Sequence, residues 1–239
     1  MLNLRQSSLL LIGFVVLFLG LTYLVQLRIE TFNDKRQLVE EFMTLPQGEY
    51  LKPALLGYDQ LMADYIWLRT IQVLGEKKVT SQGYDWIYHA LDVVTTLDPK
   101  FDYAYKMGGV ILSVLGNVPE KSNQLLLKGI RENPDVWQLP FYIGFNYFFY
   151  LNDYKNAAIY MSRASMLPGH PAYLPNLAAR LYVQAGDSET ALEFLDRMLH
   201  QTQDEKIRKT LKKRIEEIHE GKVKGIHERP RDPKSDQGL

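Results

Sequence analysis

The chain contains no cysteine among its 239 residues. This absence excludes a disulfide framework, a thiolate zinc or iron–sulfur site, a cysteine nucleophile and an acylated cysteine anchor. The chain also lacks an excess of charge, because 28 Lys and Arg residues balance 28 Asp and Glu residues. A neutral chain offers no general electrostatic attraction for nucleic acid, so we expect no nucleic-acid partner.

Sequence motifs of familiar enzymes are also absent. There is no HExxH, no GxSxG and no glycine-rich phosphate loop, and no two of the five histidines are four residues apart. We therefore expect no catalytic residues, no metal and no cofactor. One alternative stays open: a small enzyme on a helical scaffold that acts on envelope glycans or peptides. Its acids would be Asp64 and Asp85, with His89 nearby in the sequence.

One long hydrophobic run lies near the N-terminus, where twenty-two uncharged residues separate Arg5 from Arg28. A helix of that length would cross the hydrocarbon layer of about 30 Å, so residues 7–27 are predicted to form a transmembrane helix. A cleaved signal peptide is the alternative, but residues 22–26 lack the small-x-small pattern of a cleavage site.

The side of the membrane is predicted from the position of this segment. A lone apolar segment behind a short basic head usually exports the polypeptide on its C-terminal side. We therefore expect a single-pass protein of the inner membrane whose C-terminal body lies on the extracytoplasmic side. The basic residues after the segment favour the opposite orientation, which leaves a tethered cytoplasmic adaptor as an alternative.

The rest of the chain is predicted to be helical. Residues 28–56 are expected to form a short amphipathic helix followed by a linker over 44–54, where Pro46, Gly48 and Pro53 interrupt the pattern. From residue 57 onward, apolar residues recur at spacings of three and four, without a sustained two-residue alternation. This spacing predicts an all-α body.

The helical part repeats. Prolines end three helical stretches at positions 99, 134 and 168. When residues 148–168 are written over 182–202, similar residues coincide at an offset of 34: an aromatic residue, a turn residue, an aspartate and a small alanine. The matched pairs are Phe148 and Tyr182, Asn152 and Gly186, Asp153 and Asp187, and Ala157 and Ala191. The aspartate would cap a second helix, and the alanine would let two antiparallel helices approach closely.

This pattern resembles the tetratricopeptide repeat family, most clearly in Asn152–Pro168 and in Ala185–Leu192. The resemblance implies a right-handed α-solenoid of about four helix pairs over residues 57–200. The charged segment 203–219, with its narrow apolar stripe, is expected to cap the end of the stack. Residues 220–239 contain almost no apolar side chains and are expected to be disordered.

Aromatic residues crowd the segment 137–150. In the repeat family the first helix of each pair lines a concave groove, so the resemblance implies that some aromatic residues face a peptide there. The residues expected in this partner-binding groove are Tyr103, Lys106, Tyr142, Asn146, Phe149, Tyr173, Asn176 and Arg180. We therefore expect a membrane-anchored scaffold that recruits proteins or peptides, in the assembly of an envelope complex. The alternative is that the aromatic residues fill the core between repeats.

Overall fold

The computed structural model describes residues 13–25, 39, 42–75 and 84–223. Every regular element in these ranges is a helix, and no strand occurs in them, which confirms the predicted all-α class. Several predicted features lie outside the described residues: the ends of the apolar run, most of the amphipathic segment before the body and nearly all of the C-terminal tail.

The prediction of a transmembrane helix over residues 7–27 is wrong. Throughout the described ranges, no helix combines the length and the apolar character that crossing a membrane requires. The same finding contradicts the predicted single-pass location in the inner membrane.

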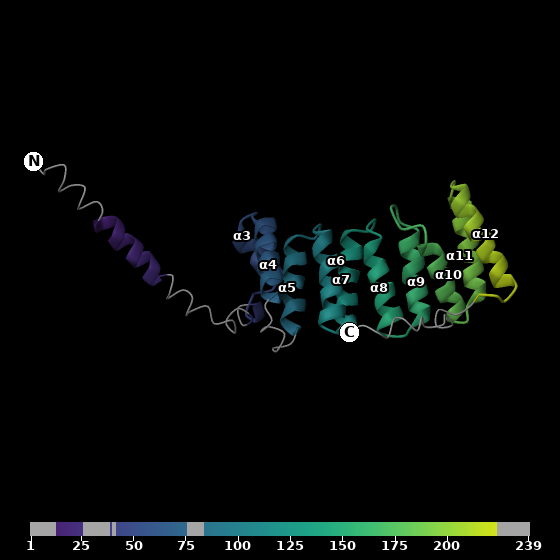
Figure 1. Cartoon of the computed structure of the whole chain (residues 1–239), viewed down its shortest axis with the longest axis horizontal. Coiled ribbons are helices and arrows are strands. Elements are labelled where there is room, and N and C mark those ends of the chain that lie inside the picture. The colour runs from purple at the N-terminus through teal and green to yellow at the C-terminus, as the bar shows by residue number, and fades with distance from the viewer. Residues whose placement is uncertain (1–12, 26–38, 40–41, 76–83, 224–239) are drawn as a thin grey trace, which may run out of the picture.

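The body is a row of helices in which each helix packs mainly on its neighbours in the sequence (Figure 1). Four pairs succeed one another: α4 (Asp59–Leu74) with α5 (Asp85–Leu97), α6 (Asp102–Val110) with α7 (Pro119–Glu132), α8 (Gln138–Phe149) with α9 (Tyr154–Ser165), and α10 (Leu174–Gln184) with α11 (Ser188–Gln201). Helix α6 continues as a short π-helix, η2 (Ile111–Leu115), and α12 (Glu205–His219) packs on α11 and α10. This all-helical row fits an α-solenoid. We call α4, α6, α8 and α10 the first helices and their partners the second helices.

A helix also forms where the sequence predicts a linker over 44–54. Helix α3 (Gly48–Leu55) lies in this segment and packs on α5. The approach is close at Gly48, because a Cβ atom there would lie 2.7 Å from the Cβ of Thr96. Val39 and Phe42 are buried in the same cluster. The linker prediction failed because proline and glycine mark a break in local periodicity, whereas packing on a distant helix can still stabilise one or two turns.

The turns between paired helices confirm the predicted caps. Asn152 and Gly186 both adopt positive φ angles, of 53° and 81°. The carboxylates of Asp153 and Asp187 then accept hydrogen bonds from the backbone N–H groups of Asn156 and Thr190, each at 3.0 Å. A carboxylate at this position satisfies one of the N–H groups that the first helical turn leaves without a partner. The repeat in the sequence is thus a repeat of turn geometry.

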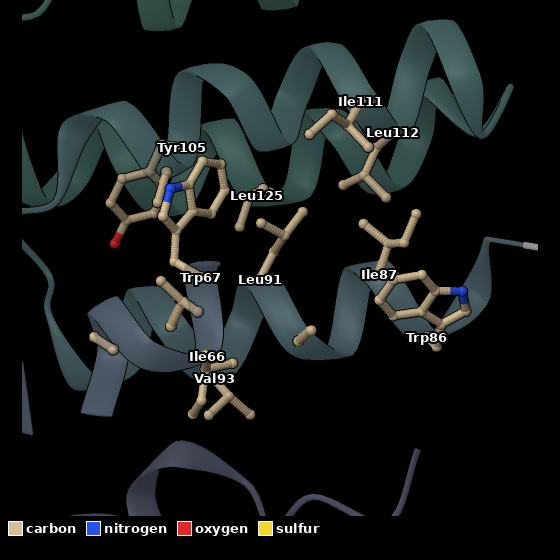
Figure 2. Close-up of a cluster of buried hydrophobic side chains, with 14 of the residues drawn as sticks. Ile66, Trp67, Trp86, Ile87, Leu91, Val93, Tyr105, Ile111, Leu112 and Leu125 are labelled. Carbon is tan, nitrogen blue, oxygen red and sulfur yellow. The ribbon is translucent and has the colours of Figure 1, made fainter. Parts of the chain in front are cut away.

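Two hydrophobic clusters form the core. The first spans α3 to α8, and Figure 2 shows part of it, with Ile87, Leu91 and Leu125 between neighbouring helices. The second spans α8 to α12. Helix α8 contributes to both, since Leu139 and Ile143 belong to the first cluster while Phe141, Phe145 and Phe148 pack on the second. A helix that packs on neighbours on both sides needs apolar residues around most of its circumference, which explains its aromatic content.

Candidate partner-binding surface

Exposed large hydrophobic side chains are distributed unevenly over the repeats. The first helices, with their N-caps and η2, expose many of them, whereas α5, α7 and α11 expose none within the described ranges. Helix α9 and its C-cap contribute Ile159 and Met166. Excluding α4, the exposed apolar side chains of the first helices are Tyr103, Val114, Leu115, Phe149 and Tyr173, which we call the first-helix surface.

On α6, Tyr103 is exposed at the surface and contacts the preceding helix pair, α4 and α5. Its ring meets that of Trp67 edge-on, with the ring centroids 5.9 Å apart. Lys106, one turn later, forms an ion pair with Asp102 at 2.7 Å between Nζ and Oδ2. The ammonium group therefore has an acidic partner on its own helix, which lowers the net charge that this part of the surface presents.

The π-helix η2 alters the surface at the end of α6. A π-helix holds one more residue than an α-helix would and so rotates the side chains beyond it. Here the Gly109 carbonyl oxygen accepts hydrogen bonds from two hydroxyl groups, Ser113 Oγ at 2.9 Å and Ser122 Oγ at 2.7 Å. Val114 and Leu115 project to the surface beyond this point. The sequence analysis did not identify either residue, because residues 111–115 continue the apolar pattern of the preceding helix.

Asn146 was predicted to line the groove and instead is buried, with a relative exposure of 1%. Its side-chain amide donates to Ser122 Oγ at 2.9 Å and to Asn123 Oδ1 at 2.8 Å. The amide therefore links α8 to α7, and Ser122 carries the link on to Gly109 of α6. A buried amide with these partners stabilises the packing of three helices and is not accessible to a bound peptide.

The other predicted residues of α8 differ in exposure. Tyr142 is half-buried and packs on the first core cluster. Phe149 is 61% exposed although its ring stacks on that of Phe145, with centroids 5.4 Å apart and planes 9° apart. Tyr150 meets both rings edge-on. A rigid ring cluster of this kind holds Phe149 at the surface with little side-chain freedom to lose on binding.

On α10, Tyr173 is the exposed N-cap residue, and Asn176 and Arg180 are half-buried. The Oδ1 atom of Asn176 is buried, and no hydrogen-bond partner for it lies in the described part of the chain. Of the eight predicted groove residues, the structure thus places Tyr103, Phe149 and Tyr173 fully at the surface, four at intermediate exposure and Asn146 in the core.

The structure describes the side chains of two of the three residues in the enzymatic alternative. Asp64 is exposed on α4, and His89 is half-buried on α5 with its Nε2 2.7 Å from the carbonyl oxygen of Leu45. Asp85 begins α5, and its side chain lies outside the described part of the chain. Among the described residues, no three His, Cys, Asp or Glu side chains converge as metal ligands would.

Comparisons with known proteins identify no relative: no protein-family model, curated protein or solved structure matches the chain. The likeness to tetratricopeptide repeats therefore rests on the residues of this chain and stays a proposal. The structure adds that exposed aromatic and aliphatic side chains occur on or next to the first helices α6, α8 and α10.

Proposed function

We propose that this protein is a protein–protein interaction scaffold that binds an apolar segment of a partner on the first-helix surface. The observation that carries the proposal is the uneven distribution of exposed hydrophobic side chains. If those side chains were ordinary surface residues, first and second helices would share them equally. Within the described ranges, α5, α7 and α11 have none, and α9 with its C-cap has only Ile159 and Met166.

The chemistry of the surface indicates the kind of segment it would bind. Its exposed aromatic members, Tyr103, Phe149 and Tyr173, come from three successive first helices. Aromatic residues are frequent in the energetically dominant centres of interfaces. Lys106 is neutralised by Asp102, so charge contributes little on α6. We therefore expect the partner segment to supply aromatic or aliphatic side chains.

A displayed library of random peptides, selected on the full chain, tests this proposal. We expect enriched peptides rich in aromatic and aliphatic residues. Their binding to the double variant Tyr103→Glu/Phe149→Glu should be at least about ten-fold weaker, because each glutamate places a charge where an apolar contact forms. Affinity is measured by fluorescence anisotropy of a labelled peptide.

The matched control is Ile159→Glu, which changes an exposed apolar side chain on the second helix α9. This variant should bind the selected peptides as the unmodified chain does. Equal binding by all three proteins, or a loss confined to the α9 variant, would show that the first-helix surface is not the binding site. Helical circular dichroism confirms that each variant is folded.

A further inference from the structure

The outer face of α4 carries an apolar stripe that no described element covers. Its members are Tyr58, Leu61, Tyr65 and Leu68, whose relative exposures are 68%, 67%, 57% and 61%. Tyr58 is the N-cap residue and the other three lie in the helix. We call these four residues the α4 stripe. The opposite side of the helix is buried in the first core cluster through Ala63, Ile66, Trp67 and Val73.

The spacing of the α4 stripe is that of a helix-pairing seam. Steps of three, four and three residues place the four side chains in one line along the helix, as the a and d positions of a coiled coil do. Four large side chains in one line, all more than half exposed, form a continuous apolar strip rather than scattered surface residues.

The two ends of the helical row differ in the face that they present. At the C-terminal end, α12 buries Leu211 and Ile218 and exposes Lys206, Lys209 and Lys212. At the other end, α4 exposes the apolar stripe, since α3 packs mainly on α5. A stack of helix pairs needs a polar outer face on its terminal units. Helix α12 has one, whereas the outer face of α4 is apolar and no described element covers it.

We propose that the helix packed on this stripe is α4 of a second copy, paired antiparallel across a two-fold axis that crosses the stripe midway between Leu61 and Tyr65. The order of residues in the stripe is self-complementary in that arrangement. Tyr58 of one copy lies opposite Leu68 of the other, and Leu61 lies opposite Tyr65, so each tyrosine ring meets a leucine. A two-fold interface requires this reciprocity, in which each residue contacts the residue that contacts it in return.

The size of the strip fits a reversible dimer. Each of the four side chains has on the order of 100 Å² free, so eight of them remove roughly 800 Å² from water, before neighbouring side chains are counted. That area is below the roughly 1,200 Å² of the smallest stable interfaces and is typical of weak, transient ones. The dimer is therefore expected to form and dissociate with concentration, with α12 and its charged face at both outer ends.

Sedimentation velocity of the full chain over a concentration series of about 1 to 100 μM tests the proposal. The expected result is a concentration-dependent doubling of the mass. In Leu61→Glu/Tyr65→Glu, four carboxylates would be brought together in the interface, and the mass should stay that of one copy. The matched control, Tyr103→Glu/Phe149→Glu, changes exposed apolar residues on other first helices and should still dimerise.

Two results of this experiment would overturn the proposal. A monomer at every concentration would mean that the strip is free or covered by another segment of the same chain. Association that persists in Leu61→Glu/Tyr65→Glu would mean that a different surface holds the copies together. Circular dichroism of both variants separates loss of association from loss of folding, because α4 remains helical in the expected outcome.

The direction of pairing has its own test, which the absence of cysteine makes simple. A mixture of Tyr58→Cys and Leu68→Cys chains, one carrying a size tag, should cross-link readily with a short bis-maleimide. Tyr58→Cys alone should cross-link poorly, because two residues at position 58 are offset by about 15 Å in the antiparallel pair. Equally efficient cross-linking of Tyr58→Cys alone would contradict the antiparallel arrangement.

Discussion

The carboxylates of Asp153 and Asp187 show how one residue carries the repeat. Each accepts a hydrogen bond from the backbone N–H of the residue three positions later, and the pKa of each carboxyl lies below the ordinary aspartate range. For Asp187 the largest cause is a hydrogen bond with the Thr190 side chain, followed by the Thr190 backbone N–H. For Asp153 the largest cause is the Asn156 backbone N–H, followed by the Asn156 side-chain amide, which approaches to 2.6 Å. The charged form is therefore favoured in the folded chain.

Replacing Asp153 with alanine should lower the free energy of unfolding by about 1 kcal/mol at pH 7, the usual value of an N-cap. Because the folded pKa is depressed, this stabilisation is present above the unfolded pKa of about 3.9 and is lost as the pH falls through the folded value. The difference between variant and unmodified chain should thus shrink below about pH 4. Urea unfolding at pH 7 and pH 3 measures both values.

The exposed carboxylate of Asp135 provides the control. Asp135→Ala should change the free energy of unfolding by less than about 0.5 kcal/mol at pH 7, as surface substitutions usually do. A cost for Asp153→Ala that did not change between pH 7 and pH 3 would show that the carboxylate charge is not responsible.

Pairs of helices pack closely because glycine and alanine occupy the contact positions. Gly129 of α7 faces Tyr105 of α6, and a Cβ atom at Gly129 would lie 2.8 Å from Cγ of the tyrosine ring. Tyr105 is fully buried and its hydroxyl donates to the Thr95 carbonyl at 3.2 Å, so the ring is fixed from the other side as well. Burial raises the pKa of this hydroxyl, which stays protonated and available as a donor.

Gly129→Ala should therefore lower the free energy of unfolding by about 1 to 3 kcal/mol, although alanine is the better helix former. The clash with a ring that cannot move outweighs the gain in helix propensity. Thermal unfolding followed by circular dichroism measures the change. The control is Gly75→Ala, where a Cβ atom meets no heavy atom closer than 3.5 Å and φ is −69°. A neutral or stabilising effect of Gly129→Ala would mean that α6 and α7 can separate at little cost.

The row of helices has no single centre, and this organisation affects how stability is distributed. Helix α12 makes its main contacts with α11 and α10, and α4 makes its main contacts with α5 and α3. In such a stack, stability is close to a sum of local terms between neighbours. A destabilising substitution at one end should therefore lower the local stability mostly at that end.

Leu211→Ala tests this view, because Leu211 is the buried leucine of α12. The substitution removes buried methyl groups and should cost about 2 to 5 kcal/mol locally. Hydrogen exchange measured by mass spectrometry should show faster exchange in α10, α11 and α12, with α4 and α5 unchanged. Uniformly faster exchange along the chain would show that the row unfolds as one cooperative unit.

Local interactions allowed the all-α class and the caps at Asp153 and Asp187 to be predicted before the structure was known. Helix periodicity and capping depend on residues within four positions of one another, and an offset of 34 repeats that local pattern. The exposed stripe of α4 could also have been found, since its spacing is visible in the sequence. The missing information was that no described element of the chain covers it.

Tertiary packing decided the rest. Asn146 lies in the core because Ser122 and Asn123, more than twenty residues earlier, supply its partners. Helix α3 forms where it packs on α5. Both outcomes depend on contacts with residues far away in the sequence, and the spacing of residues along a single helix carries no information about such contacts.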